Sequence, residues 1–284
     1  MSRIEKALER AMKMRDSGKP AALDAGGVVP MQEVQNEEVS GRCELTIENP
    51  YIITPTGSQT PLSEEYKKLK SEIVKRIRKD GSQNVIMVTS SVGGEGKSIT
   101  AINLAVSLSQ ELDHSALLVD ADIRKPSIAK YLGISACAGL SDCLIDGSEA
   151  REAVIKTGIE KLTVLPSGRA VENPVELLSS RRMKDLVQEV KHGSPGRYIV
   201  IDTPPILPFA ETRAVSRMVD GVVFVVREGM AQVQSIEEAL GLLKDTNLFG
   251  IVYTGASMEH LNGRYRYYYY RDYRGQKDSD TGKV

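Results

Sequence analysis

The feature that most constrains the fold is a glycine-rich loop between an apolar strand and a helix. Residues 84–90 read NVIMVTS, residues 91–100 read SVGGEGKSIT, and residues 103–112, NLAVSLSQEL, have helical periodicity. Glycines let backbone N–H groups close around an anion, and a helix N-terminus adds favourable partial charge. This context predicts a loop that binds the phosphates of ATP; a purely structural glycine turn is the alternative.

The residues predicted to contact the nucleotide are consecutive. Lys97 is expected to reach the β and γ phosphates, and the Ser98 hydroxyl is expected to bind Mg²⁺. The strict GxxxxGK(S/T) pattern fails at one position, because Ser91 replaces its first glycine. The predicted cofactor-binding residues are Gly93, Gly94, Glu95, Gly96, Lys97, Ser98 and Ile99.

Apolar strands and helical segments alternate through the following sequence. The predicted strands are SALLVDAD, KLTVLPS, RYIVIDTPP, GVVFVVRE and FGIVYTG, and the predicted helices include VELLSSRRMKDLVQEV and SIEEALGLLKD. Such an order with continuously apolar strands is typical of an α/β protein whose sheet is mostly parallel and covered by helices on both faces. The prediction is a doubly wound P-loop fold.

Three aspartates follow two of these strands. Asp120 and Asp122 lie at the end of LLVDAD, and Asp202 ends YIVID. Parallel strands bring their carboxyl ends to one edge of a sheet, so the three carboxylates are expected to converge near the phosphate loop. For a single aspartate, a cap or turn role is the alternative. Arg124 follows closely and has two interpretations, stabilising charge on a transferred phosphoryl group or forming a structural ion pair.

The chain divides into four predicted regions. Residues 1–16 form a short amphipathic helix, residues 17–45 a linker, residues 46–261 the P-loop domain and residues 262–284 a disordered tail. The domain opens with an amphipathic helix after Pro61, for which Ser63 is the expected N-cap. The N-terminal helix either packs on its own domain or a sister subunit, or docks on a membrane-bound partner.

Composition excludes several classes of protein. With 37 basic and 38 acidic side chains the net charge is -1, which argues against general binding to nucleic acid. Cys43, Cys137 and Cys143 form no CxxC pair and are expected to be reduced thiols. Because no apolar run exceeds strand length, the chain is expected to be cytoplasmic, without a signal peptide or membrane span.

The tail concentrates tyrosines between arginines. It holds six of the eleven tyrosines, Tyr265, Tyr267, Tyr268, Tyr269, Tyr270 and Tyr273. A stacking surface for RNA or sugar and a low-complexity end are alternatives to a cluster of phosphorylation sites.

Together these motifs resemble those of the bacterial tyrosine autokinases (BY-kinases), over roughly residues 60 to 273. The segments TSSVGGEGKS, LLVDADIRKP and YIVIDTPP resemble the family's Walker A, A′ and B motifs, and NPVELLSS at 173–180 resembles a further family segment. Two positions depart from the family: Gly93 stands where proline is usual, and Thr254 where asparagine is frequent near the nucleotide base. Partitioning ATPases carry a signature lysine where this chain has Val92.

The resemblance implies a protein-tyrosine kinase that uses ATP and Mg²⁺. The metal would be held by Ser98, Asp202 and Asp120, and Asp120 or Asp122 would accept the tyrosine proton, with Lys97 and Arg124 also catalytic. The tail tyrosines would be autophosphorylation sites. A partitioning-type ATPase and a non-catalytic nucleotide-sensing scaffold are the alternatives.

The resemblance also implies partners. A membrane polysaccharide co-polymerase would activate the kinase at the inner face of the plasma membrane, and the start MSRIEKALERA is similar to kinases of exosortase-associated exopolysaccharide loci. The segment EEYKKLK resembles the family's subunit-contact motif through Glu64, Lys67 and Lys70, which implies a homo-oligomer. An ordinary solvated helix face is the alternative, and lysine lacks the bidentate fork of the usual arginine.

Overall fold

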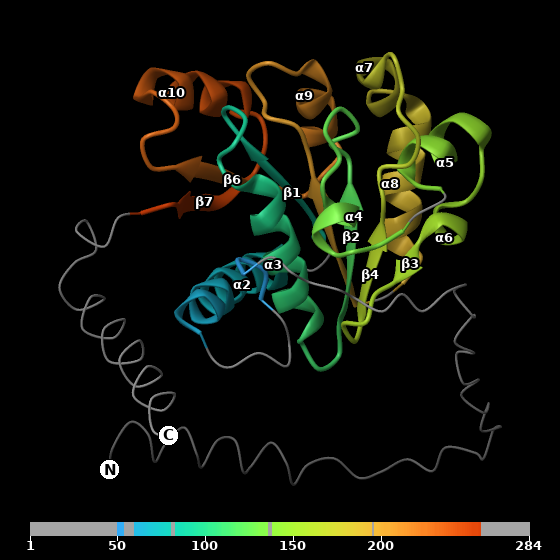
Figure 1. Cartoon of the computed structure of the whole chain (residues 1–284), viewed down its shortest axis with the longest axis horizontal. Helices are drawn as coiled ribbons and strands as arrows, with labels where there is room; N and C mark the ends of the chain where they lie inside the picture. Colours follow the sequence, from blue (N-terminus) through green and yellow to red (C-terminus); the bar gives the residue numbers. More distant parts are fainter. Residues whose placement is uncertain (1–49, 54–59, 81–82, 136–137, 195, 257–284) are drawn as a thin grey trace, which may run out of the picture. The chain divides into compact units, whose positions relative to one another are not determined.

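The computed structural model describes residues 50–53, 60–80, 83–135, 138–194 and 196–256. Its centre is a seven-stranded sheet in the order β3-β4-β2-β5-β1-β6-β7 (Figure 1). All neighbouring strands are parallel except β3 and β4. The strands are β1 (Val85–Ser90), β2 (Ser115–Asp120), β3 (Ile155–Lys156), β4 (Leu162–Leu165), β5 (Arg197–Asp202), β6 (Gly221–Arg227) and β7 (Leu248–Thr254).

Helices cover both faces of the sheet, which confirms the predicted doubly wound P-loop fold (Figure 1). They are α2 (Pro61–Asp80), α3 (Lys97–Ser109), α4 (Ile128–Tyr131), α5 (Leu140–Asp146), α6 (Ala150–Ala153), α7 (Pro174–Leu178), α8 (Arg181–His192), α9 (Ala210–Ser216) and α10 (Val233–Leu242). No helix among the described residues is long and apolar enough to cross a membrane.

The central strands are buried on both sides because their side chains alternate between two cores. In β1, Ile86 and Val88 pack in the core formed with α2 and α3. Val85 and Met87 pack in the opposite core, which includes the apolar side of α8. A strand with no polar face can be stable only between two helical layers, so the continuous apolar runs of the sequence determine this architecture.

The start of α2 differs from the prediction. The N-cap is Thr60 rather than Ser63: the Thr60 hydroxyl accepts the Ser63 N–H at 3.1 Å, and the Ser63 hydroxyl accepts the Thr60 N–H at 3.0 Å. Pro61 then occupies the first helical position, where its missing N–H is harmless. The reciprocal pair is a capping box in which serine takes the place of the usual glutamate.

The predicted helix VELLSSRRMKDLVQEV is divided into α7 and α8. The Ser179 hydroxyl donates to the Val175 carbonyl at 2.5 Å, and the Ser180 hydroxyl accepts the Met183 N–H at 3.1 Å and caps α8. Serine hydroxyls compete with helical hydrogen bonds, which explains the break at this pair. The short elements α4, α5, α6, α9 and β3 were not predicted, because each is too short to show periodicity.

Several sequence-based predictions fall outside the described residues. They are the N-terminal helix, the linker, the tail with its tyrosines, and the thiols of Cys43 and Cys137. Their assignments, and the region boundaries, therefore stay predictions. Cys143 is described, and it is a buried free thiol in α5.

Two glycines of the β6–β7 pair provide a matched test of the packing. A Cβ on Gly221 would lie 2.3 Å from the ring of Phe249, whereas a Cβ on Gly250 would have no atom within 4 Å. We expect Gly221→Ala to lower the free energy of unfolding by about 1–3 kcal/mol, the usual range for overpacking. Gly250→Ala should stay within about 0.5 kcal/mol of the wild type. Denaturant titration measures both, and equal values would contradict the packing of Phe249 on Gly221.

Candidate functional site: a phosphate loop beside three aspartates

The glycine-rich loop lies between β1 and α3, as predicted. Gly96 has a φ of 93° and is the residue before the first helical residue, Lys97. Gly94 has a φ of 85°. Both angles lie in the left-handed region that side chains disfavour, so glycine is required at these two positions. The loop therefore delivers Lys97 and Ser98 to the first turn of a thirteen-residue helix.

Lys97 lies among the predicted aspartates. Its Nζ donates to Asp122 Oδ2 at 2.7 Å, and the lysine side chain is largely buried. Burial lowers the pKa of Lys97, but the charges of Asp202, Asp122 and Asp120 outweigh it and raise the pKa above its ordinary value. The group therefore remains a cation that is positioned to contact a phosphate.

Asp120 and Asp202 are side by side at the ends of neighbouring strands. They are paired in the register of β2 and β5, so the sheet itself sets their separation. Asp120 Oδ1 accepts the Asp122 N–H at 3.2 Å, and Oδ2 accepts the N–H groups of Ser127 and Ile128, each at 3.1 Å. These are the contacts of a carboxylate that anchors the chain after β2. Burial raises the pKa of Asp120 to about 6, and the three N–H donors oppose that shift.

Asp202 has a different environment. It is fully buried, and neither of its carboxylate oxygens has a hydrogen-bond partner of good geometry among the described residues, although the Ser98 hydroxyl is near enough to lower its pKa. Burial is the largest cause that raises its pKa, to about 7, and the charge of Lys97 opposes the rise. A buried carboxylate without a partner is unfavourable, and a bound cation would satisfy it.

The residues fit the predicted Mg²⁺. The described residues hold no group of three His, Cys, Asp or Glu side chains arranged to enclose a metal. Mg²⁺ seldom needs such an enclosure, because it is bound by one or two carboxylates together with water and substrate phosphates. Ser98 and Asp202 match that requirement. The role of Asp120 as a metal ligand stays a prediction, because backbone N–H groups contact both of its oxygens.

Arg124 makes a structural ion pair. Its Nε donates to Glu211 Oε1 at 2.5 Å, and its guanidinium lies 4.8 Å from the centre of the Phe209 ring. Glu211 is fully buried in the first turn of α9. The pair joins the segment after β2 to the segment after β5. Glu211 was not predicted, because no sequence spacing connects it with Arg124.

Two residues singled out in the sequence hold the phosphate loop itself. The Glu95 carboxylate accepts the Ser91 hydroxyl and the Val92 N–H, both at 2.8 Å, so its side chain is directed into the protein and not toward a nucleotide. The Thr254 hydroxyl donates to the Glu95 carbonyl at 2.7 Å. Any contact of Glu95 with nucleotide would therefore come from its backbone.

The predicted subunit-contact residues are engaged within the chain. Lys67 pairs with Glu64 at 2.6 Å within α2, and Lys70 pairs with Glu111, beyond α3, at 2.7 Å. The Lys67–Glu64 pair is exposed, as the solvated-face alternative expects, whereas the Lys70–Glu111 pair is largely covered and connects α2 to the segment after α3. The self-association inferred from the motif remains a prediction.

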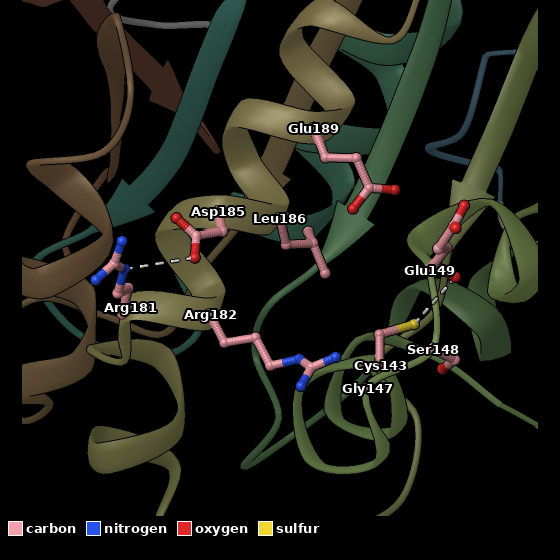
Figure 2. Close-up of a pocket in the computed structure, with 9 residues that line it drawn as sticks. All are labelled: Cys143, Gly147, Ser148, Glu149, Arg181, Arg182, Asp185, Leu186 and Glu189. Atoms are coloured by element: carbon pink, nitrogen blue, oxygen red, sulfur yellow. Dashed lines mark hydrogen bonds and ion pairs between the residues drawn. The ribbon is translucent and has the colours of Figure 1, made fainter.

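A separate cavity of about 630 Å³ lies between α8 and the segment that joins α5 to α6 (Figure 2). Its lining residues are Cys143, Gly147, Ser148, Glu149, Arg181, Arg182, Asp185, Leu186 and Glu189. None of them belongs to the phosphate-loop site. Their charges are of both signs, and Arg181 pairs with Asp185 at 3.8 Å. The cavity presents no set of groups that converge on one ligand.

Comparison with known proteins identifies the family of this chain. Residues 81–277 match a family model described as ParA: NUBPL iron-transfer P-loop NTPase. The chain is 34% identical to the tyrosine-protein kinase YwqD of Bacillus subtilis (strain 168) over 224 residues, which is 78% of this chain and 92% of that protein.

Two solved structures share the fold at 29% identity. The chimerical protein CapA2B2 has a TM-score of 0.66, and the match covers 76% of this chain and 93% of that one. The BceF tyrosine kinase domain has a TM-score of 0.61, with 68% and 76% covered. With its phosphate loop and strand-end aspartates, the chain therefore belongs to the bacterial tyrosine kinases, a family of nucleotide-binding P-loop proteins.

Proposed function

We propose that this protein-tyrosine kinase transfers the γ-phosphoryl group of ATP to the tyrosines of its own C-terminal tail, and that it thereby regulates exopolysaccharide production. The observation that carries the proposal is the position of the last described strand. Thr254 ends β7 in contact with the phosphate loop, and Tyr265 follows eleven residues later in the sequence. The short separation in sequence supports a tail that can reach the nucleotide site.

Phosphoryl transfer to tyrosine requires a metal ion, a positively charged side chain and a base, all close to the γ-phosphate. Mg²⁺ held by Ser98 and Asp202 would neutralise charge on the β and γ phosphates, and Lys97 would contact the same oxygens. Asp122 suits the role of base better than Asp120, because Asp120 accepts three backbone N–H groups through both oxygens, whereas Asp122 accepts one, from Lys125, through Oδ1 alone. Binding of ATP would separate Lys97 from Asp122, which leaves Asp122 to orient or accept the tyrosine proton.

We propose transfer between subunits, which the length of the tail allows. An extended chain covers at most about 3.6 Å per residue, so the first tail tyrosine can lie up to roughly 40 Å from Thr254. A segment of that length is compatible with transfer to a second copy of the chain. A membrane polysaccharide co-polymerase as activator follows from the family resemblance, which also supports the inner face of the plasma membrane as the place of action.

The charge of the tail supports a regulatory role, in which phosphorylation of the tail controls the association of subunits. Residues 264–274 carry four arginines and one aspartate. Phosphorylation adds about -1.5 to -2 per tyrosine, so modification of the six tyrosines would reverse the sign of the segment. Tails held beside ATP and carboxylates would then be repelled, and the assembly should loosen.

The first kinetic prediction concerns the phosphate lysine. Lys97→Met keeps a side chain of similar length and removes the charge, so autophosphorylation should fall about 100 to 1,000-fold, as for other positioned electrostatic groups. Incorporation of labelled phosphate measures the rate, and circular dichroism checks the fold. A variant with half of the wild-type rate would show that Lys97 does not contact the phosphates.

A second prediction separates the three aspartates. Asp202→Asn should weaken Mg²⁺ binding and raise the Mg²⁺ concentration needed for transfer, because an amide lacks the charge that holds the ion. Asp122→Asn should lower the rate constant at saturating Mg²⁺, with little effect on the Mg²⁺ requirement. Asp120→Asn should lower thermal stability most, because its amide group would face backbone N–H donors. Identical Mg²⁺ profiles for all three variants would contradict these assignments.

A mixing experiment tests the proposed function directly. Chains that carry Lys97→Met but keep the tail are combined with active chains truncated after Ala256, in the presence of ATP and Mg²⁺. We expect phosphotyrosine on the full-length inactive chains, detected by mass spectrometry of the tail. Inactive chains without label would exclude transfer between subunits. ATP hydrolysis without phosphotyrosine in wild-type protein would instead favour a partitioning-type ATPase.

A further inference from the structure

Hydrogen bonds connect the phosphate loop to the carboxyl ends of β6 and β7. We propose that Glu95 and Thr254 are positioning residues for nucleotide binding: together they clamp the loop to the end of β7, so that loop geometry and the order of this strand end depend on each other. The clamp deepens the proposed function, on which its relevance to the tail rests. Its test is nucleotide affinity, which can be measured whether or not tyrosine is phosphorylated.

Glu95 closes the loop on itself and on β6. Its Oε2 accepts the Ser91 hydroxyl and the Val92 N–H, each at 2.8 Å, and its Oε1 accepts the Arg227 N–H at 3.4 Å. A carboxylate in an anion-binding loop would repel phosphate unless its charge were directed away and satisfied. Three donors on the inner side meet that condition. The Glu95 carboxylate also gives the Ser91 hydroxyl a partner, at the position where the strict pattern has glycine.

Two backbone carbonyl groups of the loop accept hydrogen bonds from side chains at the ends of β6 and β7. The Glu95 carbonyl accepts the Thr254 hydroxyl at 2.7 Å, and the Gly94 carbonyl accepts Arg227 Nη1 at 3.3 Å. In a trans peptide the C=O and the following N–H point in opposite directions. Holding these carbonyls toward β6 and β7 therefore turns the N–H groups of Glu95 and Gly96 to the other side, where they can donate to phosphate oxygens.

Thr254 also packs on the turn that starts α3. Its side chain lies 3.6 Å from the position of a Cβ on Gly96, whose φ of 93° initiates the helix. A side chain at residue 96 would therefore meet Thr254, so glycine at this position also lets the end of β7 approach the loop closely.

The other partner in the clamp is an edge strand of the sheet. Among the described strands β7 pairs with β6 alone, the register of this pair shifts between Val222 and Val223 of β6, and Ile251 and Tyr253 of β7 are exposed. Edge segments with few buried contacts open most readily. A ligand that orders the loop should therefore stabilise the end of β7 through Thr254, and by linkage the order of β7 should favour the ligand.

The test compares threonine variants at the two ends of β7 in the full-length chain. Thr254→Val keeps the shape and removes the hydroxyl donor, Thr254→Ser keeps the donor, and Thr246→Val removes a similar donor, bound to the Leu243 carbonyl at 2.6 Å, before β7. With fluorescent ADP and Mg²⁺, Thr254→Val should raise Kd about threefold or more, the expected effect of one lost hydrogen bond. Thr254→Ser should bind ADP more tightly than Thr254→Val, because it keeps the hydroxyl donor, and Thr246→Val should bind like the wild type.

A second series examines the carboxylate. Glu95→Ala should raise the same Kd by about tenfold or more, because a charged acceptor with three donors is lost. Adding Ser91→Gly to Glu95→Ala removes the unpaired hydroxyl and should recover part of the affinity, and Glu95→Gln should lie between Glu95→Ala and the wild type. If Glu95→Ala does not fold, the comparison of Thr254→Val with Thr254→Ser tests the proposal by itself.

Hydrogen exchange supplies a readout that a merely structural role would not change. Addition of ADP and Mg²⁺ should slow exchange at residues 251–254 in the wild type and in Thr246→Val, and should do so much less in Thr254→Val. Equal affinity and equal protection in Thr254→Val and the wild type would overturn the clamp. If these effects are observed but the wild-type protein forms no phosphotyrosine, the clamp stands and the proposed function is overturned.

Discussion

The buried carboxylate of Asp202 is the constraint around which the site is organised. It ends β5 inside the protein, and among the described residues neither oxygen has a hydrogen-bond partner of good geometry, so a cation nearby stabilises its charged form. Lys97 provides one positive charge, and a metal ion bound with ATP would provide another. The neighbouring Asp120 avoids the same difficulty through three backbone N–H donors. Two aspartates in one register thus have different environments, because their local hydrogen bonding differs.

The sheet brings these groups together and also connects them with the tail. β1, β2 and β5 deliver the loop, Asp120 and Asp202 to one edge. β6 and β7 extend the same edge as far as Thr254, which contacts Glu95. The order of the strands therefore brings Thr254, the last residue of β7, to the phosphate loop, and the proposed substrate segment follows β7 in the sequence.

Much of this arrangement could be predicted, because continuous apolar strands and a glycine-rich turn specify a P-loop sheet by themselves. The convergence of Lys97 with Asp120, Asp122 and Asp202 followed from the strand ends. The distinct environments of the aspartates could not be predicted. These environments depend on the N–H groups of Ser127 and Ile128, which no motif marks. The partners Glu211 and Arg227 were missed for the same reason: their contacts join distant segments. The cap of α2 was misassigned by three residues, because Thr60 and Ser63 are both good caps.

The central claim, that this nucleotide site phosphorylates tyrosine in the chain's own tail, is tested most directly by intact-mass measurement. Protein purified from its producing cells is analysed before and after treatment with a tyrosine phosphatase, and its tail is then mapped by peptide sequencing. The account predicts a series of masses separated by whole phosphate groups, which collapses to a single mass after the phosphatase, with the phosphates on residues 265–273. A single mass that is unchanged by the phosphatase, in protein that hydrolyses ATP, would contradict it.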